Sequence, residues 1–149
     1  MTRNIKKWLF ALTGAFFITT AALADNDKPI TISQLPAAAQ TVVKTYFKNK
    51  KVALAKQEND TFSKTYEVIF TDGDKIEFAK NGQWTDIECS KAVFPASLVP
   101  APIKAYVKSN YAGSKIVKIE RDKKEYDVKL SSGLEITFDK KFRVIDIDD

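Results

Sequence analysis

The chain has 149 residues, of which 24 are lysine or arginine and 19 are aspartate or glutamate, so its formal net charge is +5. It contains no histidine and a single cysteine, Cys89. This composition removes the commonest general base and metal ligand, a thiolate metal cluster and any disulfide within the chain. We expect Cys89 to be a small buried residue rather than a nucleophile or an intermolecular crosslink, because free cysteine is usually buried and no histidine can activate it.

The first 24 residues have the pattern of a secretory signal peptide. Three basic residues precede an apolar run from Trp8 to Ile18, and Ala22-Leu23-Ala24 forms a small-residue cleavage pattern. The run is short for a membrane span, which needs about 20 apolar residues. We therefore expect cleavage after Ala24 and a periplasmic or secreted protein with no stable membrane span, with an uncleaved anchor as the alternative. The remaining 125 residues would have a net charge of +2, which gives no indication of a nucleic-acid partner.

Beyond the leader, the sequence predicts two similar units, residues 25–89 and 98–149, joined by a linker of residues 90–97. Each unit opens with a proline-marked helix, and in the first unit Ser33 is the candidate N-cap. Helical positions match at an offset of 64 and strand positions at an offset of 60. The four extra residues of the first unit fall in the turn between its first two strands, where a repeated fold tolerates a change of length.

Alternation of apolar and polar residues predicts four strands after each helix. The expected strands span Val52–Gln57, Thr65–Thr71, Lys75–Ala79, Trp84–Glu88, Lys115–Arg121, Glu125–Ser131, Glu135–Asp139 and Arg143–Ile147. One face of each sheet is apolar and would be covered by the helix, whereas the other is polar and open. The fold class is therefore α+β, with two tandem repeats that each pack one helix, with or without a short extra turn, on a four-stranded antiparallel sheet.

The acidic stretch "TDGD" in the first unit is interpreted as a hairpin turn rather than a metal site. Asp72, Asp74 and Glu77 are potential calcium ligands, but their spacing does not fit a calcium loop. The second unit keeps only the glycine of this stretch, Gly133, which a tight turn needs for a positive φ. A second hairpin turn is expected at Asn81-Gly82, and its glycine-free counterpart "DKKFRV" is expected to adopt a different form.

The charged clusters favour solvent exposure over chemistry. The lysine runs at residues 48–51 and 121–124 are flanked by acids, so we interpret them as solvated loops rather than phosphate contacts. The densest acidic group, Asp146 with Asp148 and Asp149, lies at the end of the chain and is interpreted as a solvated tail. No glycine-rich phosphate-binding pattern is present. We predict no cofactor, no metal and no catalytic residue.

Trp84 has two interpretations. Strict alternation places it on the open face with Asp86 and Glu88, where an exposed tryptophan would be a natural anchor for a partner. A β-bulge in the strand would instead turn the ring toward the edge of the core. The matching position in the second unit is Val144.

The repeated pattern resembles a known family. Leu35-Pro36 with Tyr66, Val68, Gly73, Ile76 and Phe78 forms the first copy, and the second is Val99-Pro100 with Tyr126, Val128, Gly133, Ile136 and Phe138. This arrangement is similar to the β-lactamase-inhibitor-like, PepSY-like domain family, exported proteins of Bacteroidota and related bacteria. The resemblance implies a fold like that of the β-lactamase inhibitory protein, in which two helix-plus-four-strand repeats form a concave surface that grips a protein. The disulfides of that inhibitor cannot form here.

These observations predict a monomeric, non-catalytic binding module that contacts a protein or peptide through the open sheet face, with inhibition of an envelope enzyme as one form of that role. The candidate contact residues are Trp84, Glu67, Glu77, Asp127, Lys129 and Glu135. One alternative is a carboxylate-based envelope hydrolase, which needs two converging acids with at least one raised pKa. The other is a small-ligand carrier, which needs an apolar cavity.

Overall fold

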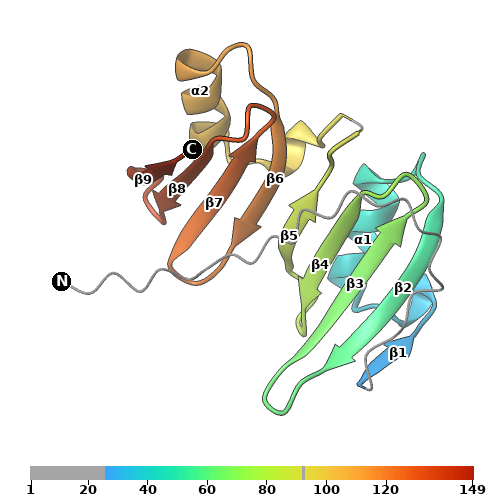
Figure 1. The fold of residues 1–149 in the computed structure, drawn as a ribbon. Helices are drawn as coiled ribbons and strands as arrows, with labels where there is room; N and C mark the ends of the chain where they lie inside the picture. The colour runs from blue at the N-terminus through green and yellow to red at the C-terminus, as the bar shows by residue number, and fades with distance from the viewer. Residues whose placement is uncertain (1–25, 92) are drawn as a thin grey trace.

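The structure, a computed structural model, describes residues 26–91 and 93–149 (Figure 1). The expected signal peptide and its cleavage point lie outside these residues. The helices are η1 (Ile32–Gln34), α1 (Ala37–Tyr46), η2 (Ala96–Leu98) and α2 (Ala101–Asn110). The strands are β1 (Asp27–Pro29), β2 (Val52–Asn59), β3 (Lys64–Phe70), β4 (Lys75–Ala79), β5 (Trp84–Glu88), β6 (Ile116–Arg121), β7 (Glu125–Leu130), β8 (Glu135–Asp139) and β9 (Val144–Asp148).

The strands form one antiparallel sheet of nine in sequence order, and β5 pairs with β6 to join the two halves (Figure 1). The α+β class with antiparallel strands is confirmed, since residues 26–91 and 93–149 form two α-helices, two short 3₁₀ helices and this open sheet. The predicted bounds of β4, β5 and β8 coincide with those observed, and the other predicted strands agree within two residues. Strand β1 was not predicted, because the sequence of residues 27–29 is polar and contains a proline.

Both α-helices begin directly after a proline. Pro36 and Pro100 are the N-cap residues of α1 and α2, and their carbonyls accept the first helical hydrogen bonds, from Gln40 and Lys104, at 3.0 and 3.1 Å. The prediction that Ser33 caps the first helix is therefore wrong. A separate 3₁₀ turn forms first, and the fixed φ of Pro36 suits the α-helix start that follows.

An unbroken apolar row crosses the inner face of the sheet. Cross-strand pairing aligns Val68, Ile76, Ile87, Ile119, Val128 and Ile136 on six successive strands. All six are buried, and they share one hydrophobic core with Ala39 and Val43 of α1 and Ile103 and Val107 of α2. Both helices thus cover the same face, and the opposite face of the sheet is left open.

The two halves share their backbone irregularities. The pairing of β4 with β5 shifts between Glu77 and Phe78, and that of β8 with β9 shifts between Thr137 and Phe138. The glycine in the turn of the β3–β4 hairpin and that in the turn of the β7–β8 hairpin both have a positive φ, as a tight turn requires. The values are +90° at Gly73 and +98° at Gly133.

The β8–β9 turn contradicts its prediction. It was expected to differ from the Asn81-Gly82 turn because it lacks glycine, yet Phe142 has a φ of +62° where Gly82 has +83°. The hydrogen bonds are also equivalent: the N–H of Gly82 donates to Ala79 O at 2.8 Å, and that of Phe142 to Asp139 O at 2.9 Å. The Phe142 ring packs 5.5 Å from that of Tyr126, and this contact offsets part of the cost of a left-handed backbone.

Candidate binding face of the sheet

A row of carboxylates crosses the centre of the open face. The register pairs Glu67 with Glu77, Glu77 with Asp86, Asp86 with Glu120 and Glu120 with Asp127, one acid on each strand from β3 to β7. We call these five residues the acidic row. Directly opposed side chains in an antiparallel sheet lie roughly 4.5–5.5 Å apart at Cβ, so neighbouring carboxylates repel one another. The row begins beside Lys56 and continues through Thr137 to Asp146.

Two lysines hold part of this row in ion pairs. Lys118 Nζ lies 2.8 Å from Asp86 Oδ2, and both residues are more than nine-tenths buried although they are on the open face. Lys56 Nζ lies 3.0 Å from Glu67 Oε2 and 2.9 Å from Asp27 Oδ2, which ties β1 to the row. The second carboxylate oxygen of Asp86, Oδ1, is buried without a hydrogen-bond partner. Part of the acidic row is therefore already neutralised by lysines of the same face.

The crowding and partial burial of these acids change their proton affinity. Burial raises the pKa of Glu120 to about 7, and the nearby charge of Asp86 adds to the effect. Burial, with the charges of Asp86 and Glu67, also raises the pKa of Glu77. For Asp86 the cost of burial outweighs the attraction of Lys118, so its pKa is raised as well. A cation brought to this face would be stabilised by each of these carboxylates.

A second row beside the first mixes both signs of charge. It comprises Lys75, Glu88, Lys118, Lys129, Glu135 and Asp148. Lys129 pairs with Glu135 at 3.0 Å, and Lys75 lies 3.7 Å from Glu88. Asp127, the last residue of the acidic row, accepts a hydrogen bond at its Oδ1 from the Thr137 hydroxyl at 2.6 Å. Five of the six predicted contact residues, Glu67, Glu77, Asp127, Lys129 and Glu135, therefore share one face.

Trp84 lies on the other face. The bulge at the start of β5 pairs Trp84 with Phe78 on the inner side of the sheet, and the tryptophan is only 6% exposed. The interpretation that a bulge turns the ring inward is confirmed, and the exposed placement is wrong. Trp84 is therefore not part of the candidate binding face.

Asp86, Lys118 and Glu120 are among the residues of this face that were not predicted contacts. Alternation within each strand indicates that they point outward, and this signal was available in the sequence. Their importance comes from the pairing of β5 with β6, which sets Asp86 opposite Glu120 and Glu88 opposite Lys118. Alternation within a strand carries no information about which strand lies beside it.

The "TDGD" turn is structured by a lysine. Lys50 Nζ lies 2.5 Å from Asp72 Oδ2 and also pairs with Asp74, whose side chain is fully buried. Although burial opposes the charged form, these two acids raise the pKa of Lys50. The glycine turn is present as predicted, but the expectation that residues 48–51 form only a solvated loop is wrong for Lys50.

Cys89 lies nearby and is buried as predicted, and burial raises its thiol pKa to about 12.

Two cavities lie away from the acidic row. One of about 410 Å³ borders the linker, α2 and β6, and another of about 470 Å³ borders the β2–β3 hairpin. Neither is lined by a residue of the acidic row.

Within residues 26–91 and 93–149, no three acidic or cysteine side chains are grouped so that they could hold a metal ion. In the same part of the chain, no helix is long and apolar enough to cross a membrane.

Comparison with known proteins identifies the family. Residues 64–146, which run from β3 into β9, match the family model described as "Putative beta-lactamase-inhibitor-like, PepSY-like". The chain belongs to this family. The predicted resemblance is thus confirmed. No protein of curated function matches the chain.

Solved structures of PepSY-like relatives cover nearly the same span. A periplasmic protein of the DUF2874 family from Bacteroides vulgatus is 56% identical, with a TM-score of 0.82 over 85% of this chain and 99% of its own. A protein from Bacteroides thetaiotaomicron, described as calcium-regulated and periplasmic, is 51% identical, with a TM-score of 0.83 over 84% and 98%. A third, a periplasmic protein of unknown function from B. vulgatus, is 37% identical, with a TM-score of 0.77 over 83% and 99%. These descriptions support a periplasmic location for this PepSY-like chain.

Proposed function

We propose that this protein is a non-catalytic binding module of the bacterial periplasm that holds a basic segment of a protein or peptide on the open face of its sheet. The observation that carries the proposal is the acidic row, in which five strands in succession each contribute one carboxylate. A surface of like charges is costly to maintain and is relieved by a partner of the opposite charge.

The charge of this face is opposite to that of the whole chain. The acidic row with its flanking residues and the second row together carry nine carboxylates and four lysines, whereas residues 25–149 as a whole have a net charge of +2. The basic residues are accordingly concentrated elsewhere on the molecule. This separation of charge favours one orientation for an approaching basic partner.

Proton linkage gives the proposal a specific consequence. Since burial and neighbouring acids raise the pKa of Glu120 to about 7, this group is partly protonated near neutral pH. A basic ligand binds the ionised form, so binding would release a proton from the face. Affinity should therefore rise as the pH increases from 6 to 8.

The non-catalytic part of the proposal is supported by the chemistry of the same residues. The chain has no histidine, and the described cavities are not lined by the acidic row. A raised pKa at Glu120 meets one requirement of the hydrolase alternative, but a pocket in which two acids meet a substrate is the other requirement. The inhibitor-like description of the family agrees with a protein partner, which would make inhibition of an envelope enzyme one form of this binding.

We also infer that residues 25–89 and 98–149 are tandem repeats, each with one α-helix and four matching strands, β2–β5 in the first and β6–β9 in the second. The register shift after Val52 in β2 recurs after Ile116 in β6, an offset of 64, and the later shifts recur at an offset of 60. Duplication followed by pairing of β5 with β6 would join three acids of the first half to two of the second in one acidic row. The repeat would thus account for the width of the binding face.

The test is calorimetric titration of the protein beginning at Asp25 with a lysine- and arginine-rich peptide at pH 8, and with a glutamate-rich peptide of equal length. We expect the basic peptide alone to bind, and affinity to fall as salt is added. Glu77→Gln with Glu120→Gln should weaken binding roughly tenfold, which corresponds to about 1.4 kcal/mol. The matched control removes two charges elsewhere, with Asp60→Asn and Asp149→Asn, and should bind as the wild type does.

Equal binding by the two double variants would refute the role of the acidic row. A calcium arm is included because the B. thetaiotaomicron relative is described as calcium-regulated. Calcium binding that requires Glu77 and Glu120, in the absence of any peptide binding, would replace the proposal with a cation site.

A further inference from the structure

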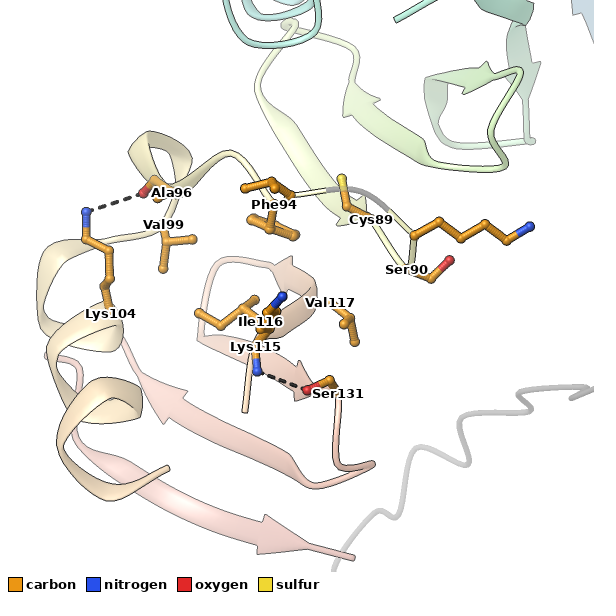
Figure 2. A pocket seen from close by; sticks show the side chains of 12 residues that line it. Cys89, Ser90, Phe94, Ala96, Val99, Lys104, Lys115, Ile116, Val117 and Ser131 are labelled. Carbon is orange, nitrogen blue, oxygen red and sulfur yellow. Dashed lines mark hydrogen bonds between the residues drawn. The ribbon is translucent and has the colours of Figure 1, made fainter. Parts of the chain in front are cut away.

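A groove of about 410 Å³ lies where the linker leaves the sheet, between the linker and β6 (Figure 2). Its walls come from three parts of the chain: the segment after β5, the start of α2, and β6. None of the residues that line it belongs to the acidic row. The groove is therefore a separate feature from the proposed binding face.

The groove exists because the segment that leads into η2 in the second half follows a different path from the segment that leads into η1 in the first. In the first half, β1 runs along β2 and leads directly into η1, and the N–H of Ile30 still donates to Ala55 O at 2.9 Å. In the second half, β5 occupies the corresponding edge of β6, and the N–H of Cys89 donates to Val117 O at 2.8 Å. The chain must then leave the sheet to reach η2. The space between this linker segment and β6 is the groove.

The walls are mainly apolar. Figure 2 shows Phe94 and Val99 on the linker side and Ile116 and Val117 on the strand side, with Cys89 at one end. Phe94, Val99 and Cys89 are at least nine-tenths buried. Burial raises the pKa of the Cys89 thiol to about 12, so the thiol itself carries no charge. Such a lining suits the hydrocarbon part of a ligand.

The charged residues of the lining all have the same sign. Lys91, Lys104 and Lys115 line the groove, and none of its other described lining residues is acidic. The Lys104 ammonium donates to Ala96 O at 3.5 Å, a long and weak bond, and its other hydrogens remain able to meet a ligand (Figure 2). An apolar channel with ammonium groups at its rim is complementary to a molecule with a hydrocarbon body and a carboxylate head.

We propose that this groove binds an aliphatic carboxylate. The carboxylate pairs with the ammonium of Lys104 or of Lys115, and the hydrocarbon chain lies between Phe94 and Val99 on one side and Ile116 on the other. The volume of about 410 Å³ falls in the range of roughly 300–1,000 Å³ typical of small-molecule sites. The protein would then carry two independent sites, one for a basic partner on the open face and one for an amphipathic anion.

The probe is decanoate, titrated by calorimetry and followed by the methyl resonances of Ile116 and Val117. We expect binding with shifts at these two residues, and roughly tenfold weaker binding when Lys104→Gln and Lys115→Gln are combined. Lys108→Gln with Lys44→Gln removes two helix charges that do not line the groove and serves as the matched control. Ala96→Trp, which fills the groove from an exposed position, should abolish binding while the melting temperature is retained.

Three results would overturn the proposal. Decanol bound as tightly as decanoate would remove the role of the lysines. Unchanged methyl resonances of Ile116 and Val117 would place any binding elsewhere. Attachment to phosphatidylglycerol vesicles without binding of free decanoate would identify a membrane-surface patch instead. Peptide binding at the open face should be unaffected by the Lys104 and Lys115 changes, so the two proposals fail or succeed separately.

Discussion

The guanidinium carbon of Arg121 lies 3.7 Å from the ring centroid of Trp84, and its Nε donates to the Trp84 carbonyl at 2.7 Å. The two residues belong to β5 and β6, the strands that join the halves of the sheet. The matching position of Trp84 is Val144, on β9, which in the described residues pairs only with β8. The position thus holds the large Trp84 on β5, where β6 pairs alongside, and the smaller Val144 on β9, where the described sheet ends.

Replacing Trp84 with valine, the residue of the second half, should destabilise the protein by about 2–4 kcal/mol, because a buried ring is lost and a cavity remains. Arg121→Ala should cost about 1–2 kcal/mol through loss of the cation–π contact and the hydrogen bond. In the double variant the two costs should be less than additive, because both changes remove the same contact. Urea unfolding measures all three, with Phe62→Val, at a side chain that is 97% exposed, as the neutral control. Full additivity would show that the ring and the guanidinium do not stabilise each other.

The sequence was sufficient to predict both α-helices and strands β2–β9, because alternation and proline position are local signals. It was insufficient where a distant contact decides the outcome. Trp84 could be placed only by knowing of the bulge opposite Phe78, and the acidic row only by knowing that β5 pairs with β6. Likewise, Phe142 adopts a positive φ in a turn without glycine, and its ring packs against Tyr126. A local pattern cannot show such a contact.

Gly82→Ala should destabilise the protein more than the same change at the other turn glycines. A Cβ at Gly82 would lie 2.9 Å from Pro36 Cβ and 3.0 Å from Ala39 N, at the start of α1, and its φ of +83° already disfavours alanine. Gly133 has a φ of +98° but open space around it, so Gly133→Ala should cost only the backbone strain of about 1–2 kcal/mol. Gly113→Ala, with neither feature, is the control. Chemical denaturation should rank the losses Gly82, Gly133, Gly113, and any other order would contradict the packing argument.

Lys50→Met should cost about 3–5 kcal/mol, because it leaves the carboxylate of Asp74 buried without its cation. The neighbouring exposed lysine gives the control, Lys51→Met, which should be close to neutral. The second half has Ser114 and Leu134 at the matching positions, so it forms the same turn without this ion pair. The double variant Lys50→Ser with Asp74→Leu should therefore recover most of the stability. If it were no more stable than Lys50→Met in thermal unfolding, the buried charge would not be the cause of the loss.

Glu120→Gln should stabilise the protein at pH 8 and have little effect at pH 5. Burial and the charge of Asp86 raise the pKa of Glu120 from 4.5 to about 7 in the folded state. Between these two values the unfolded chain releases the proton more readily, so the wild type loses stability as the pH rises through this window, and above pH 7 the loss is complete. Glutamine has no proton to release and avoids the loss.

Because Glu120 is only half-buried, solvent screening reduces the full linkage energy, and we expect a gain of about 1 kcal/mol at pH 8. For a domain of this size the melting temperature should rise by roughly 3–6 °C. Differential scanning calorimetry at half-unit intervals from pH 5 to pH 8 would follow the growth of this difference. Asp148→Asn, an exposed acid on β9, should show no such growth. A constant difference between Glu120→Gln and the wild type across the range would mean that Glu120 has an ordinary pKa, and would remove the proton release predicted when a basic partner binds.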